Sequence, residues 1–182
     1  GGGGEGGAWH LGADVRADPD PAHYQSRKLS ALAQDAAERG ADWVVPVDAD
    51  EIWTGRKGTL KETLEALPDW ILVAEATLYD YVPTGLDNGA LHPVERIRWR
   101  RQHPLRLPMV AVRVLAETTI HDGNHGVTYG HHPVPPIIKH LLRVSHFPYR
   151  SAEHMIRKSR KGGAALAAAI ELDEGVGAHW RA

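Results

Sequence analysis

The residues with the clearest capacity for chemistry form one acidic run, Asp48-Ala49-Asp50-Glu51. Two carboxylates separated by one residue in a loop can converge on a hard divalent cation, which prefers oxygen ligands. The run directly follows an apolar segment of strand length, residues 43–47, so its charge falls where a strand leaves a sheet. A solvated acidic loop is the alternative interpretation. Concentrated negative charge at a sheet edge favours a metal site, with Asp48 and Asp50 as ligands.

The histidines need sorting by position, because there are 12 of them in 182 residues. His146 ends the apolar run 138–147, which places it at the carboxyl end of a predicted strand, where α/β proteins bind ligands. The alternative is a half-buried histidine at a strand terminus. His121 and His125 share the spacing of a zinc protease motif, but Asp122-Gly123-Asn124 between them is a turn sequence without the required glutamate. A zinc protease is therefore not expected.

A second candidate site follows His146. Tyr149, Arg150 and the helix that Ser151 should cap could bind a phosphate or diphosphate, because helix N-termini and guanidinium groups attract anions. Lys and Arg at 157–161 either extend this site or form a solvated helix face, and the arginines at 96–106 are a weaker candidate. The sequence has no P-loop and no G-x-S-x-G elbow, which leaves P-loop phosphoryl transfer and serine hydrolysis without support.

The elements that must position these residues alternate between helix and strand, which predicts an α/β sheet with ligands at the carboxyl ends of its strands. A helix over 22–39 should end at Gly40, and Thr59 with Glu62 forms a capping box for a helix that ends near Pro68. A last helix starts at Ser151 and should break at Gly162-Gly163. The predicted strands are residues 43–47, 70–82, 109–115 and 138–147, with an irregular excursion over 83–108.

Length and composition limit the number of domains, the kinds of partner and the kinds of chemistry that the chain can have. A chain of 182 residues fits one domain, expected over 22–182, after a flexible glycine-rich segment over 1–21. With 21 basic and 23 acidic residues, the net charge of -2 gives no global attraction to nucleic acid. The absence of cysteine excludes disulfides and thiolate chemistry, and no apolar stretch is long enough for a transmembrane segment. We therefore expect a soluble, cytoplasmic protein that binds no nucleic acid.

Taken together, these motifs resemble glycosyltransferases of the GT-A fold, in the bacterial branch similar to glycosyltransferase family 2. The central motif resembles the DADEFW of that family, with Ile52 in place of phenylalanine. The resemblance covers residues 23–165 and implies a Rossmann-like nucleotide-sugar-binding fold, an Mn²⁺ or Mg²⁺ ion, and transfer of a sugar from a nucleotide-sugar donor to an acceptor hydroxyl. It is carried by Gln25-Ser26-Arg27, residues 40–53, Gly123-Asn124-His125, residues 146–151, Lys158 and Gly162.

The resemblance also implies roles for individual residues. The implied metal ligands are Asp48, Asp50 and His146. The implied donor-binding residues are Gln25, Arg27, Asp48, Arg150 and Lys158, and the implied acceptor-binding residues are Trp53, Asn124 and His125. An inverting reaction needs a carboxylate base, but the Glu-Asp pair of many relatives is absent here, which leaves Asp122 and Glu153 as candidates.

Relatives of this kind open with a strand that binds the nucleotide base, and residues 1–21 hold too few apolar side chains to supply it. We therefore expect the GT-A fold to lack its N-terminal strand, the reading frame to begin upstream, and this partial domain to associate and turn over weakly. Two other functions stay open. One is a non-catalytic nucleotide- or carbohydrate-binding module of the same fold, and the other is a structural domain stabilised by Ca²⁺.

Overall fold

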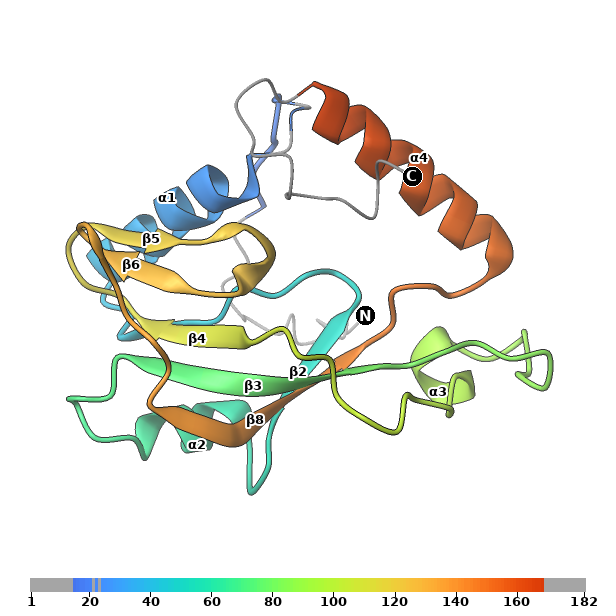
Figure 1. The fold of residues 1–182 in the computed structure, drawn as a ribbon, viewed down its shortest axis with the longest axis horizontal. Helices are drawn as coiled ribbons and strands as arrows, with labels where there is room; N and C mark the ends of the chain where they lie inside the picture. The colour runs from blue at the N-terminus through green and yellow to red at the C-terminus, as the bar shows by residue number, and fades with distance from the viewer. Residues whose placement is uncertain (1–14, 21, 23, 169–182) are drawn as a thin grey trace, which may run out of the picture.

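The computed structural model describes residues 15–20, 22 and 24–168, drawn in colour in Figure 1. Most of the expected flexible segment 1–21 lies outside the described residues, and so does the expected end of the domain at residue 182. The described part is a mixed α/β structure with one large and one small sheet. The predicted α/β class is therefore confirmed.

In the described part of the chain, five strands form the large sheet in the order β1-β4-β3-β8-β2. Strands β3 and β8 are parallel, whereas the β1–β4, β4–β3 and β8–β2 pairs are antiparallel. The sheet is thus mixed rather than doubly wound. Its strands are β1 (Trp43–Val44), β2 (Glu51–Gly55), β3 (Val73–Asp80), β4 (Met109–Arg113) and β8 (Ile138–His146).

The small sheet was not predicted from the sequence. It contains β5 (Thr118–Ile120), β6 (Val127–Tyr129) and β7 (His132–Pro133), with the 3₁₀ turn η1 (Asp122–Asn124) between β5 and β6. Strands of two or three residues are too short to show a periodic pattern. Helix α1 (Gln25–Glu38) packs against this sheet, as Figure 1 shows.

The core lies on both faces of the large sheet, because successive residues of a strand point to opposite sides. Ala74 of β3 and Ala111 of β4 face a cluster with Leu142 and helix α2 (Leu60–Glu65). Their neighbours Val73, Val110 and Val112 face a second cluster with Ile120 and Ala33 of α1. Burial on both faces holds the strand ends, and the residues that follow them, in fixed positions.

The predicted helix ends are mostly confirmed. Gly40 follows α1 with φ of 87° and forms a Schellman motif, in which the Ala41 N–H donates to the Ala36 carbonyl at 3.0 Å. Thr59 and Glu62 form the predicted capping box of α2. Ser151 Oγ accepts from the His154 N–H at 3.0 Å at the start of α4 (Ala152–Ala167).

Two sequence predictions are wrong. Helix α4 continues through Gly162-Gly163, because glycine lowers helix propensity by about 1 kcal/mol without removing a backbone donor. The strand predicted over 43–47 has only two residues, and it is an antiparallel edge strand rather than a buried parallel one. The chain leaves the sheet before Pro46, which has no N–H to donate to a ladder.

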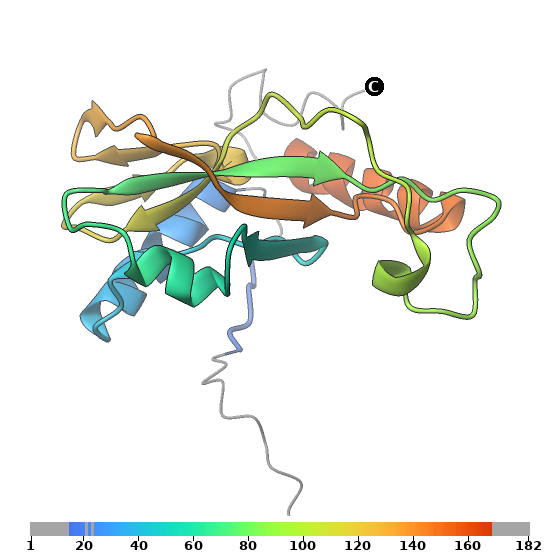
Figure 2. The same cartoon turned by 90° about the horizontal axis from the view of Figure 1, so that it is seen from below.

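The predicted metal-binding residues lie at one end of the large sheet. Strands β3 and β8 end there, β2 begins there, and the loop from β1 to β2 crosses it. Figures 1 and 2 both show α4 and α3 (Pro93–Arg96), the helix of the excursion 83–108, beyond the ends of β3 and β8. No helix in the described residues is both long and apolar enough to cross a membrane.

Candidate functional site

Strand register brings the predicted metal ligands together. His146, the last residue of β8, is paired with Glu51 at the start of β2, and the Phe147 N–H donates to the Asp50 carbonyl at 2.8 Å. The His146 Nε2 atom consequently lies 3.7 Å from Asp50 Oδ2. Asp50 and His146, which the resemblance implies as ligands of one ion, thus lie close together. Their role as metal ligands stays a prediction.

The Asp50 carboxylate is buried and lies between two cationic groups. Its side chain is 10% exposed, and Lys158 Nζ from α4 contacts the same Oδ2 atom that faces His146. Burial alone would raise the pKa of Asp50, but hydrogen bonds from His146 and Lys158 outweigh burial and lower it far below its ordinary value. Asp50 is therefore a permanent anion at the centre of the site.

His146 is held from its other side by Asp80, the last residue of β3. The distance from His146 Nδ1 to Asp80 Oδ1 is 2.8 Å. Burial lowers the pKa of His146, yet the hydrogen bonds to Asp50 and Asp80 outweigh it and raise the pKa to about 9. His146 is thus a cation at neutral pH in the metal-free protein.

Asp48 is tied to α1 and to the turn η1. Its Oδ1 accepts from Gln25 Nε2 at 3.3 Å, and Gln25 Oε1 accepts from the Gly123 N–H at 2.8 Å. Gly123 has φ of 73°, a conformation that glycine adopts without strain. Burial and the nearby Asp50 charge raise the pKa of Asp48, opposed by Lys158, His146 and His125. Gln25, assigned to the donor, thus contacts an acidic residue of the site.

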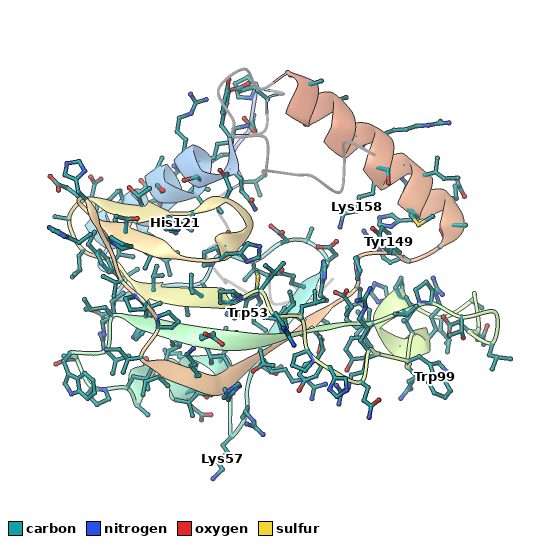
Figure 3. The ribbon with its side chains drawn as sticks, viewed as in Figure 1. Trp53, Lys57, Trp99, His121, Tyr149 and Lys158 are labelled. Carbon is teal, nitrogen blue, oxygen red and sulfur yellow. The ribbon has the colours of Figure 1, made fainter. Side chains whose placement is uncertain are left out.

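A groove of about 590 Å³ runs between the acidic loop and α4. Asp48 and Asp50 line one wall. The other wall is a basic stripe formed by Arg150, which precedes α4, and by His154, Arg157, Lys158 and Lys161 of α4. Within α4, His154, Lys158 and Lys161 follow an i, i+4, i+7 spacing and Arg157 is adjacent to Lys158, which puts all four on one helix face. Figure 3 shows Lys158 reaching from α4 toward the sheet. Of the basic residues at 157–161, Lys158 pairs with Asp50, whereas Arg157, Arg160 and Lys161 are exposed and Arg160 does not line the groove. Both interpretations of this segment stay open for the exposed residues.

Arg150 has a buried guanidinium nitrogen without a partner. Among the described residues, its Nε atom is buried and makes no hydrogen bond, while its Nη2 lies 3.0 Å from His154 Nε2. Burial and the positive charges of Arg150, Arg157 and Lys158 lower the pKa of His154. Buried N–H groups normally have a partner, and an oxyanion is the natural one for a guanidinium.

The other predicted site residues lie elsewhere. Arg27 pairs with Asp20 at 2.9 Å and does not line the groove. Asp122 Oδ1 accepts from the Ser26 N–H at 2.8 Å, which satisfies an N-terminal donor of α1. Glu153 is exposed in the first turn of α4, outside the residues that line the groove. The roles of Arg27 in donor binding and of Asp122 and Glu153 as bases stay predictions.

The three residues that the resemblance assigns to acceptor binding are buried or in contact with other protein groups. Trp53 is 8% exposed in the core, and its indole N–H donates to Glu51 Oε2 at 3.0 Å. Burial raises the pKa of Glu51 despite this hydrogen bond. Asn124 is fully buried, and His125 Nδ1 lies 2.7 Å from the Pro108 carbonyl. Only Trp53 supports the acidic loop, through Glu51, whereas both polar side-chain atoms of Asn124 are buried without a hydrogen-bond partner among the described residues. Acceptor contact by the three residues stays a prediction.

Sequence reasoning missed Asp80 and His154. The sequence held a usable signal for His154, because it lies four residues before Lys158 in the predicted helix and so shares its helix face. The sequence held no such signal for Asp80, since only the parallel pairing of β3 with β8 places it opposite His146.

The donor atoms of Asp48, Asp50 and His146 suit Mn²⁺ or Mg²⁺ by type, since both ions favour carboxylate oxygen and Mn²⁺ accepts imidazole. Among the described residues, however, no three histidine or acidic side chains are grouped closely enough to hold a metal ion. Lys158 and His146 supply the positive charge around Asp50 instead. An ion that binds there must replace the Lys158 ammonium.

Comparisons with protein-family models, with curated proteins and with solved structures find no match to this chain.

Proposed function

We propose that this chain is a glycosyltransferase domain of GT-A type, which uses a divalent metal to transfer a sugar from a nucleotide-sugar donor to an acceptor hydroxyl. One observation carries the proposal. A loop with two carboxylates, Asp48 and Asp50, faces the basic stripe of α4 across a single groove at the carboxyl ends of parallel strands. Carboxylates opposite cationic groups are what a metal-bound diphosphate needs.

The basic stripe supplies the diphosphate contacts in this proposal. Arg150 offers a guanidinium with an unused N–H, and Lys158 and Lys161 offer ammonium groups on the same wall. When bound, the divalent ion neutralises charge on the departing nucleoside diphosphate. The Lys158 ammonium group then moves from the Asp50 carboxylate to a phosphate oxygen, so it is paired with an anion both before and after the donor binds.

The acceptor hydroxyl must lose a proton while its oxygen bonds to the sugar and the bond from sugar to diphosphate breaks. In an inverting reaction a carboxylate takes that proton. Asp122 and Glu153 are the candidates from the sequence, and neither lines the groove. The base therefore has to be found by mutation.

The test is an assay of nucleoside diphosphate release from a panel of nucleotide sugars, with Mn²⁺ and with EDTA, alongside Asp50→Asn. The proposal expects release that requires the metal and is lost in the variant. Metal-dependent binding of the nucleotide without any turnover would point instead to a non-catalytic binding module. Metal binding that is indifferent to nucleoside diphosphate would point to a structural Ca²⁺ site.

A further inference from the structure

We propose that Asp80 is a positioning residue, which orients the His146 imidazole so that its Nε2 faces Asp50. This orientation follows from the described geometry alone. Its consequence for metal binding rests on the proposed function.

The imidazole lies between two buried carboxylates. Asp80 Oδ1 is 2.8 Å from Nδ1, and Asp50 Oδ2 is 3.7 Å from Nε2. The side chains of Asp80 and Asp50 are only 13% and 10% exposed, so water competes weakly for these contacts. The short contact is the one to Asp80, and it fixes the ring so that the opposite nitrogen points into the acidic loop.

The backbone makes this arrangement rigid. Asp80 and His146 are register partners at the ends of the parallel strands β3 and β8, and the Tyr81 N–H donates to the His146 carbonyl at 2.7 Å. The rings of Tyr81 and Phe147, the next residues along each strand, stack with centroids 4.7 Å apart. The backbone positions of Asp80 and His146 are therefore fixed relative to each other by the pairing of the two strand ends.

Asp80 is itself oriented from outside the pair. The Arg101 N–H donates to the Asp80 carbonyl at 2.9 Å, and Arg101 Nε lies 3.5 Å from Asp80 Oδ2. One carboxylate oxygen thus faces arginine and the other faces imidazole. Arg101 belongs to the arginine cluster 96–106, which the sequence offered as a weaker candidate for anion binding, and here it contributes to this support.

A carboxylate on one imidazole nitrogen fixes the direction of the other, which is how proteins orient metal-binding histidines. The plainer alternative is an ion pair that only stabilises the ends of β3 and β8. The two differ in one respect, because a positioning residue acts on metal binding solely through His146.

The experiment compares Asp80→Ala and Asp80→Asn with the control Glu75→Ala. Glu75 is also a carboxylate on β3, is 18% exposed, and pairs with Lys139 at 3.6 Å, away from the groove. In the metal-free protein, proton NMR with ¹⁵N-labelled histidine reports whether the His146 Nδ1 proton is protected from exchange. Calorimetry with Mn²⁺ alone then gives metal affinity, also in the His146→Ala background.

The proposal expects a protected Nδ1 proton in the wild type and in Glu75→Ala, and its loss in Asp80→Ala. Mn²⁺ affinity should fall roughly ten- to a hundred-fold in Asp80→Ala and less in Asp80→Asn, which keeps an acceptor oxygen. In the His146→Ala background, Asp80→Ala should have no further effect.

An unchanged Nδ1 proton in Asp80→Ala overturns the proposal, and so does an equal loss of affinity with and without His146. A wild type that binds no Mn²⁺ contradicts the proposed function instead, and the Nδ1 proton still decides whether Asp80 orients His146. If Asp80→Ala does not fold, Asp80→Asn carries the comparison.

Discussion

Asp50 is the residue on which three segments meet. Its backbone carbonyl is bound by Phe147 after β8, and its carboxylate contacts His146 and Lys158. Two positive groups on one buried carboxylate keep it ionised and hold α4 against the loop. In the proposed reaction a divalent ion takes over the charge that Lys158 supplies.

Asp50→Asn should therefore lower the Mn²⁺-dependent affinity for a nucleoside diphosphate on the order of ten-fold or more, because one charged ligand is lost. Asp48→Asn should act in the same direction. The core should stay folded in both, but Asp50→Asn should also lower the free energy of unfolding, because it leaves His146 and Lys158 without their shared buried counter-charge. Calorimetry measures the affinity, and Glu38→Gln on the exposed face of α1 is the control. Unchanged affinity in Asp50→Asn would rule out its role as a ligand.

His146 gives the metal-free protein a specific pH dependence. Its pKa is raised from 6.5 to about 9 in the folded state, chiefly by Asp50 and Asp80 against the effect of burial. The charged imidazole therefore stabilises the fold fully below about pH 6.5, and this stabilisation is lost as pH rises through about 9. Relative to His146→Gln, the wild type should lose up to about 3 kcal/mol of unfolding free energy across this window. Urea unfolding in EDTA at several pH values measures it, and parallel curves for the two proteins would contradict it.

Metal binding should depend on the same proton. A histidine ligates only as the neutral imidazole, so Mn²⁺ must displace a proton from His146 and release about one proton per ion near pH 7. Calorimetry in two buffers of different ionisation enthalpy counts the protons released. Release that persists unchanged in His146→Ala would show that another group is the source.

At the scale of elements, α4 supplies most of the basic wall opposite the acidic loop. Its basic stripe faces the groove, whereas the exposed Arg160 lies off it. Lys161→Ala and Arg150→Ala should each weaken nucleoside diphosphate binding about ten-fold, which is the scale of a hydrogen bond to a charged group. Arg160→Ala is the control on the same helix. Equal effects of all three changes would mean that α4 attracts the nucleotide only by diffuse charge.

Local signals in the sequence predicted most elements. The cap residues Gly40, Thr59 and Ser151 mark helix ends because their effects act within one turn. Sequence reasoning also located the acidic loop and His146 at strand ends. The small sheet and the role of Asp80 could not be predicted, because both depend on pairing between strands distant in the chain. The helix break predicted at Gly162-Gly163 is not found, because the low helix propensity of glycine opposes a helix only weakly.

At the scale of the whole molecule, positive and negative residues are nearly equal in number, but in the groove they lie on opposite walls. The chain has a net charge of -2, yet one groove places a basic helix face opposite two carboxylates. An anion is therefore attracted to this groove rather than to the molecule in general. The two core clusters bury β3 and β4 from both faces and so anchor the sheet whose strand ends carry Asp80 and His146.

The central claim is that metal and diphosphate bind together in this groove. Calorimetric titration of the wild type with nucleoside diphosphates, with Mn²⁺ present and with EDTA, tests it most directly. Tight binding of at least one nucleoside diphosphate that needs Mn²⁺, together with Mn²⁺ binding that tightens when the nucleotide is present, is the expected result. Nucleotide affinity that is the same in Mn²⁺ and in EDTA would contradict the account.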